Sequence, residues 1–170
     1  MMERPLSPSG EETTKVMTDQ ATEHTIIAAS PDRCVAVAMD IERYPEWARD
    51  IKEAIVVERD EEGRPLRVEF RAAAMGHSAR YTLRYDHSTP NTLAWVLEQG
   101  DVVRKLDGEY VFEPVDGDEA ATSVTYHLVV EMAVPLPGFI KRRAEGRIMT
   151  TALAELKRRC EAGTPATPAT

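Results

Sequence analysis

The feature that most constrains this chain is its last long segment with apolar periodicity, residues 137–160. Apolar residues recur there every four positions, which is typical of an amphipathic helix, and at about 1.5 Å per residue the helix would span roughly 35 Å. The expected stripe is made of Ile140, Ala144, Ile148, Ala152 and Leu156, with Met149 and Leu153 in a second row beside them. Such a helix cannot bury its stripe alone, so the preceding chain must supply a sheet that receives it.

Seven segments before this helix have the alternating or β-branched character of strands. They are residues 23–29, 51–59, 65–74, 79–85, 93–97, 102–114 and 122–134. The last six follow one another through short turns, so they must pair antiparallel. One face of these strands is apolar and the other is charged. The sequence therefore predicts an α+β protein, in which a curved seven-stranded antiparallel sheet wraps the helix at residues 137–160.

Two short helices are expected between the first and second strands. Ser30 and Pro31 form an N-cap followed by proline at the first helical position, and the helix they open runs to about Met39. A second helical turn over residues 40–44 is expected to end at Pro45. Residues 21–162 are predicted to form one domain, with disordered segments at residues 1–20 and 163–170.

Composition excludes several classes of function. A net charge of -8 argues against nucleic acid as the main partner. Cys34 and Cys160 lack the spacing of a metal or redox motif, and a reduced cytoplasmic protein without cofactor is the expectation, with a disulfide between them as the lesser alternative. No run approaches the roughly 18 apolar residues of a membrane span. The histidines are scattered and no known catalytic or metal motif is present, so we predict no catalytic residue and no metal site.

Three local patterns carry a resemblance to a known family. They are Asp40-x-x-x-Tyr44-Pro45-x-Trp47, the strand at residues 108–114 (GEYVFEP), and residues 135–139 (PLPGF) at the start of the long helix. Together with the order of elements, they resemble the START-like (SRPBCC) superfamily, in particular its polyketide cyclase/dehydrase and lipid-transport branch. The resemblance implies a helix-grip fold, with a deep apolar cavity between sheet and helix that holds a lipid, quinone, sterol or polyketide. That superfamily shares no single catalytic motif, so no catalytic role is transferred to this chain.

Strand parity and the helix stripe give the residues expected to face such a ligand. They are Phe70, Ala72, Ala74, Tyr81, Leu83, Trp95, Tyr110, Phe112, Tyr126, Leu128, Val130, Met149 and Leu153. Large inward residues give way to small ones at Ala72 and Ala74, and the next strand begins with Ala79. We therefore expect the cavity to open at this rim.

The preferred function is a carrier of a hydrophobic small molecule. The alternatives are a polyketide aromatase/cyclase that acts on a substrate in the cavity, and an interaction module whose cavity is closed.

The basic cluster Lys141, Arg142 and Arg143 lies beside apolar residues at the start of the long helix. Basic and apolar side chains together suit contact with an anionic membrane or an acidic partner. The preferred alternative is an ordinary solvated helix face, with Lys141 paired to Glu145 four residues on.

Overall fold

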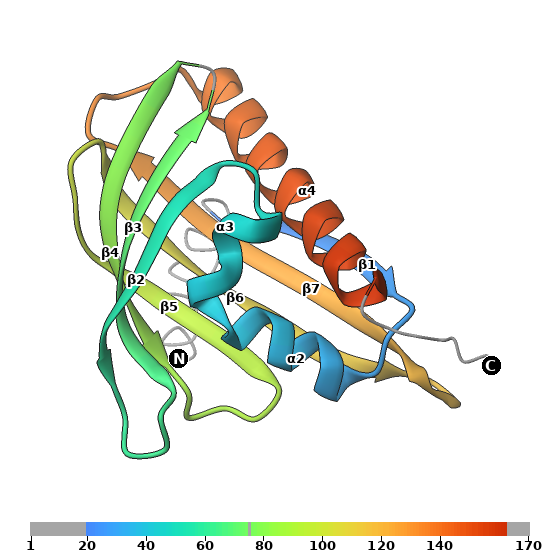
Figure 1. The fold of residues 1–170 in the computed structure, drawn as a ribbon. Coiled ribbons are helices and arrows are strands. Elements are labelled where there is room, and N and C mark those ends of the chain that lie inside the picture. The colour runs from blue at the N-terminus through green and yellow to red at the C-terminus, as the bar shows by residue number, and fades with distance from the viewer. Residues whose placement is uncertain (1–19, 75, 163–170) are drawn as a thin grey trace, which may run out of the picture.

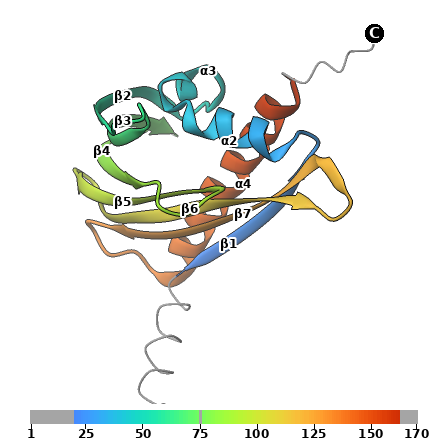
Figure 2. The same cartoon turned by 90° about the horizontal axis from the view of Figure 1, so that it is seen from below.

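The structure, a computed structural model, describes residues 20–74 and 76–162 (Figure 1). In these ranges seven strands form one antiparallel sheet in the order β1-β7-β6-β5-β4-β3-β2. The strands are β1 (Ala21–Ile27), β2 (Ile51–Arg59), β3 (Pro65–Ala74), β4 (His77–Asp86), β5 (Thr92–Gly100), β6 (Val103–Val115) and β7 (Asp118–Met132). Figure 2 shows the sheet bending from β1 through β5 to β2, with helix α4 (Gly138–Ala162) crossing its open side. The predicted helix-grip fold is confirmed.

The strand ends follow the turns that join them. Strand β7 begins at Asp118, four residues earlier than predicted, because the chain reverses over two residues and pairs again at once. Gly117, with φ of 73°, supplies the left-handed conformation that such a tight hairpin needs. Strand β1 pairs with β7 alone, which brings the first and last strands of the sheet together.

Two helices and a helical turn connect β1 to β2. Ser30 caps helix α2 (Pro31–Met39), its hydroxyl accepting a hydrogen bond from the Arg33 N–H at 3.2 Å. The 3-10 turn η1 (Ile41–Arg43) follows, and then helix α3 (Tyr44–Trp47). The prediction that Pro45 ends the helical segment is wrong. Pro45 lies in the first turn of α3, where its missing N–H has no helical partner to lose.

Several of the most deeply buried side chains lie where α2 and the last turns of α4 meet the sheet. Phe112, Val124 and Leu128 of the sheet, Leu156 of α4 and Cys34 of α2 are each at most 1% exposed. Both cysteines are thiols in this core. A hydrogen bond with the Cys160 thiol is the main reason that the pKa of Cys34 is lowered, to about 7.

Helix α4 presents a different face from the predicted one over its first half. Ile140 and Ile148 are 41% and 43% exposed, and Ala144 is also exposed, so these three residues do not belong to the buried stripe. At 3.6 residues per turn, positions four apart advance by about 40°, so a row from Ile140 to Leu156 turns through about 160° and cannot keep facing the sheet. The buried side chains of α4 are Glu145, Met149, Leu153, Glu155, Leu156 and Cys160, so Met149, Leu153 and Leu156 are buried as predicted.

Candidate functional site

The inward face of the sheet carries a continuous set of aromatic rings. Cross-strand register places Phe70 opposite Tyr81, and their ring centroids lie 5.3 Å apart. On the other side of β5, the rings of Trp95 and Tyr110 lie 5.5 Å apart, and Tyr110 pairs with Tyr126 at 4.5 Å. The structure therefore brings together the aromatic residues that strand parity selected, although their role in ligand binding stays a prediction.

Helix α4 does not lie evenly over this aromatic face. Its backbone packs chiefly against β1, β7, α2 and α3, and less closely against the central strands β3 to β6. The aromatic side chains of those central strands lie in the region between the sheet and the helices α3 and α4, and the rings of Phe70 and Tyr44 of α3 are 6.4 Å apart. This is the region where a bound molecule would have to fit.

The predicted ligand-facing residues differ in how deeply they are covered. Most are buried, namely Phe70, Leu83, Trp95, Phe112, Tyr126, Leu128, Val130, Met149 and Leu153. Ala72, Ala74, Tyr81 and Tyr110 are only partly buried, and so is Ala79, which pairs directly with Ala72. The incompletely covered alanines gather at the tip of the β3–β4 hairpin, at the same end of the molecule as the start of α4 (Figure 1).

The tyrosine hydroxyls on this face are neutral groups. Burial raises the pKa of Tyr81, Tyr85, Tyr110 and Tyr126 above the ordinary value of a phenol. The hydroxyls of Tyr110 and Tyr126 also hydrogen bond to each other. Such groups can donate or accept hydrogen bonds, but they are poor bases at neutral pH.

Two buried carboxylates on α4 were not among the predicted site residues. Glu155 is 5% exposed, and its Oε2 accepts a hydrogen bond from the Arg49 N–H at 3.2 Å. Glu145 is 6% exposed, and its Oε2 accepts no hydrogen bond. Glu145 lies four residues before the buried Met149, so the sequence did contain a signal for this residue. Glu155 had no comparable signal.

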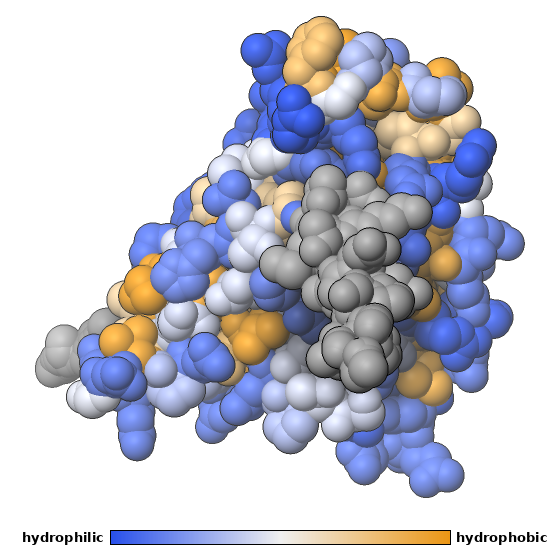
Figure 3. All heavy atoms as spheres, turned by 180° about the vertical axis from the view of Figure 1, so that it is seen from behind, coloured by the Kyte–Doolittle hydropathy of each residue, from blue (hydrophilic) through white to orange (hydrophobic). Residues whose placement is uncertain are grey.

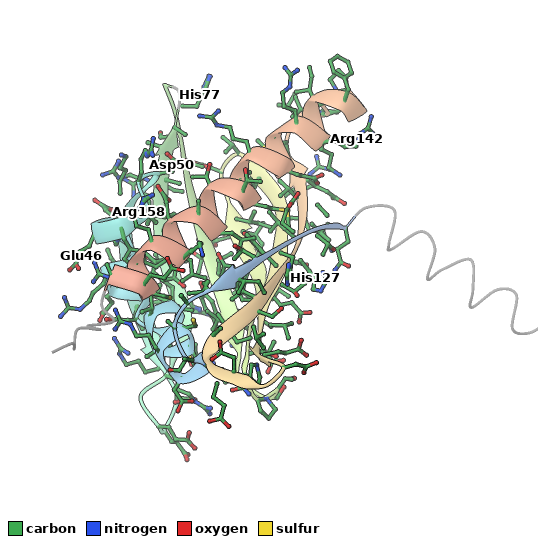
Figure 4. The ribbon with its side chains drawn as sticks, turned by 90° about the vertical axis from the view of Figure 1, so that its right-hand side faces the viewer. Glu46, Asp50, His77, His127, Arg142 and Arg158 are labelled. Atoms are coloured by element: carbon green, nitrogen blue, oxygen red, sulfur yellow. The ribbon has the colours of Figure 1, made fainter. Side chains whose placement is uncertain are left out.

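His77 and His127 lie away from this region, whereas His87 stacks on Tyr85 with ring centroids 6.5 Å apart. Figure 4 shows His77 at the hairpin tip, where it is exposed, and His127 among side chains of the sheet's outer face. The His127 Nδ1 atom hydrogen bonds to the Thr22 hydroxyl at 2.9 Å. In residues 20–74 and 76–162, no cluster of His, Cys, Asp and Glu has the arrangement of a metal site. No helix in the same ranges is long and apolar enough to cross a membrane.

Two hollows lie outside the predicted opening. The larger, about 630 Å³, lies by the β2–β3 and β4–β5 turns and reaches Tyr85 and Trp95 from the end of the strands opposite Ala72. The smaller, about 170 Å³, lies between α2 and the end of α4, where Arg33 and Arg159 contribute to its wall. Neither was predicted.

Comparisons with known proteins agree with the geometry. A family model described as polyketide cyclase / dehydrase and lipid transport matches residues 27–157. A START superfamily structure from Mycobacterium smegmatis is 24% identical with a TM-score of 0.81, and the match covers 85% of this chain and 99% of that one. An aromatase/cyclase from a Streptomyces species is 15% identical with a TM-score of 0.75, over 89% of this chain and 98% of that one. A protein from Thermus thermophilus is 23% identical with a TM-score of 0.70, over 85% and 99% of the two chains. A search of curated proteins gives no match.

Proposed function

Because the chain belongs to the polyketide cyclase/dehydrase and lipid transport family, we propose that it binds a hydrophobic small molecule between the sheet and the first half of α4. One observation carries the proposal. Tyr81 and Tyr110 lie among buried aromatic rings, yet both keep accessible surface, and Tyr81 is next to a rim where the inward side chains are alanines. A mostly apolar region with a few hydroxyls is the usual composition of a pocket for a lipid, quinone or polyketide-like molecule.

A carrier fits this region better than a catalyst does. The tyrosines are held neutral by burial, so they would orient a ligand through hydrogen bonds without removing a proton from it. The exposed carboxylates Glu69 and Glu131 lie on the outer face of the sheet, where a ligand under α4 could not reach them. We place the carrier in the cytoplasm.

Native mass spectrometry of gently purified protein tests the proposal. We expect a retained species heavier than the polypeptide, which organic solvent extracts as an apolar molecule. A single unliganded mass, unchanged after incubation with a panel of quinones, fatty acids and aromatic polyketides, would contradict ligand binding and favour the closed interaction module.

A polyketide aromatase/cyclase is the second candidate, and one observation favours it. The inward face holds a carboxylate, Glu145, that accepts no hydrogen bond at one oxygen and could act on a bound substrate as a base. The overall likeness to an aromatase/cyclase fits the same idea. Incubation with a linear poly-β-ketone and a search for a cyclised, dehydrated product separates the two functions, since a carrier returns the ligand unchanged.

We also propose that the carrier exchanges its ligand at an anionic membrane, through the end of the molecule where α4 begins. Val134 and Phe139 are 68% and 67% exposed there, next to the exposed Arg142 and Arg143. Figure 3 shows hydrophobic and strongly hydrophilic residues side by side at this upper end. Lys141, also counted in this basic cluster, forms the predicted ion pair with Glu145 at 3.7 Å, and its side chain is only 29% exposed. The membrane surface is therefore assigned to Arg142 and Arg143 with Val134, Leu136, Phe139 and Ile140.

Vesicle binding tests this surface. Arg142→Gln with Arg143→Gln should weaken binding to phosphatidylserine vesicles by roughly 1 kcal/mol per arginine, and added salt should weaken the unaltered protein in the same way. Lys141→Gln serves as the control with little effect. No binding of the unaltered protein at low salt would contradict the membrane proposal and leave this surface as a solvated helix face.

A further inference from the structure

The inward face of α4 contains one carboxylate, that of Glu145, with a buried oxygen atom that accepts no hydrogen bond. Glu145, Met149 and Leu153 are spaced four apart on the face that covers the sheet, and all three are buried. A buried charged group without a hydrogen bond is costly, and such groups in folded proteins normally have a partner. Glu145 Oε2 has none, and the cation that pairs with it, Lys141 Nζ, is 3.7 Å away, which is an ion-pair distance rather than a hydrogen bond.

The other two glutamates of α4, Glu155 and Glu161, both accept hydrogen bonds from neighbouring groups. Glu155 Oε2 accepts a hydrogen bond from the Arg49 N–H, and Glu161 Oε2 accepts one from the Ala28 N–H at 2.8 Å and one from Lys157 Nζ at 2.7 Å. Both residues join α4 to neighbouring segments of the fold. Glu145 makes no such connection, so its burial is not explained by the fold.

We propose that Glu145 is the polar anchor of the ligand, accepting a hydrogen bond from a hydroxyl group at one end of an otherwise apolar molecule. The inference rests on the proposed function and adds the chemical class of the ligand. The acceptor requires a donor, and Lys141 already balances its charge, so a neutral hydroxyl suits the site better than an ammonium group. A phenol or an alcohol on a ring system or chain fits, with its apolar part against the inward face of the sheet.

The probes are 2-naphthol and 2-methoxynaphthalene, which share a ring system and differ in that only the first can donate an O–H. Quenching of tryptophan fluorescence gives both dissociation constants for the full chain. The unaltered protein should bind 2-naphthol at least about tenfold more tightly, because a hydrogen bond to a charged group contributes more than a neutral one. Glu145→Leu should remove that preference and leave the affinity for 2-methoxynaphthalene unchanged or higher. Glu145→Gln, which keeps one acceptor oxygen, should fall between the two.

The same substitution at an exposed carboxylate of the outer face, Glu131→Leu, is the matched control and should change neither affinity. Equal binding of both probes by the unaltered protein, or a 2-naphthol preference that survives in Glu145→Leu, would overturn the anchor while leaving the proposed function intact. Failure of both probes to bind, with no retained ligand by native mass spectrometry, would overturn the proposed function and the anchor with it.

Discussion

The two halves of α4 are built differently. In the second half, Leu153, Leu156 and Cys160 are at most 4% exposed, and Glu161 ties the helix to the backbone of Ala28. In the first half, Phe139 is 67% exposed, and the buried Glu145 has a carboxylate oxygen that accepts no hydrogen bond. The second half of α4 is therefore well packed. The first half has exposed hydrophobic side chains and a buried carboxylate oxygen without a hydrogen bond.

This difference separates stability from function along one element. The second half packs against α2 and β1 and holds the fold together. The first half keeps exposed hydrophobic side chains and an unpartnered carboxylate oxygen, which a membrane or a ligand could contact. Substitutions at matched positions in the two halves of α4 test this division.

The largest expected effect comes from placing a charge on each half. Leu153→Asp would bury a carboxylate with no partner, which should lower the free energy of unfolding by about 3–5 kcal/mol. Ile148→Asp puts the same side chain on the exposed side of the first half and should stay within about 0.5 kcal/mol of the unaltered protein. Urea unfolding measures both changes. Equal losses would mean that the two halves are packed alike.

The buried carboxylates give a smaller and more specific contrast. Glu155→Leu leaves the Arg49 N–H without its acceptor and should cost about 1–3 kcal/mol of unfolding free energy. Glu145→Leu removes a buried charge that accepts no hydrogen bond at Oε2, and Lys141, whose side chain is 29% exposed, can turn to water, so the ligand-free protein should be equally stable or more stable. Thermal melts without ligand check both variants, and a clear loss in Glu145→Leu would assign that residue to the ion pair with Lys141 alone.

A still smaller effect is expected from pH at the end of the helix. Hydrogen bonds from Ala28 and Lys157 lower the pKa of Glu161. Its stabilisation is therefore complete above the ordinary glutamate pKa and is lost as pH falls through the lowered pKa of the folded state. Glu161→Gln should cost roughly 1 kcal/mol at pH 7, since the group is partly exposed, and almost nothing at pH 2. A stability difference that does not change with pH would rule out the charge as its source.

Strand alternation predicted the fold and the inward aromatic residues because a two-residue period leaves little choice of face. The helix was harder to predict. Apolar residues at Ile140 and Ile148 satisfied a four-residue spacing, yet that spacing rotates around a real helix, and the fold is anchored at Leu156 and Cys160. Glu145 was missed for the opposite reason, because a charged residue on an inward face contradicts the hydrophobic pattern used to find that face. Such contradictions are expected where function, rather than packing, selects the residue.

We propose that the region between the sheet and the first half of α4 is not filled by protein side chains. The most direct test is the unfolding free energy of Ala72→Phe, at the alanine rim, measured beside Val124→Phe in the packed core, where the residue is fully buried. Overpacking should cost Val124→Phe about 1–3 kcal/mol. Ala72→Phe should instead be as stable as the unaltered protein or more stable, and it should lose ligand binding. A loss in Ala72→Phe as large as that in Val124→Phe would contradict the account.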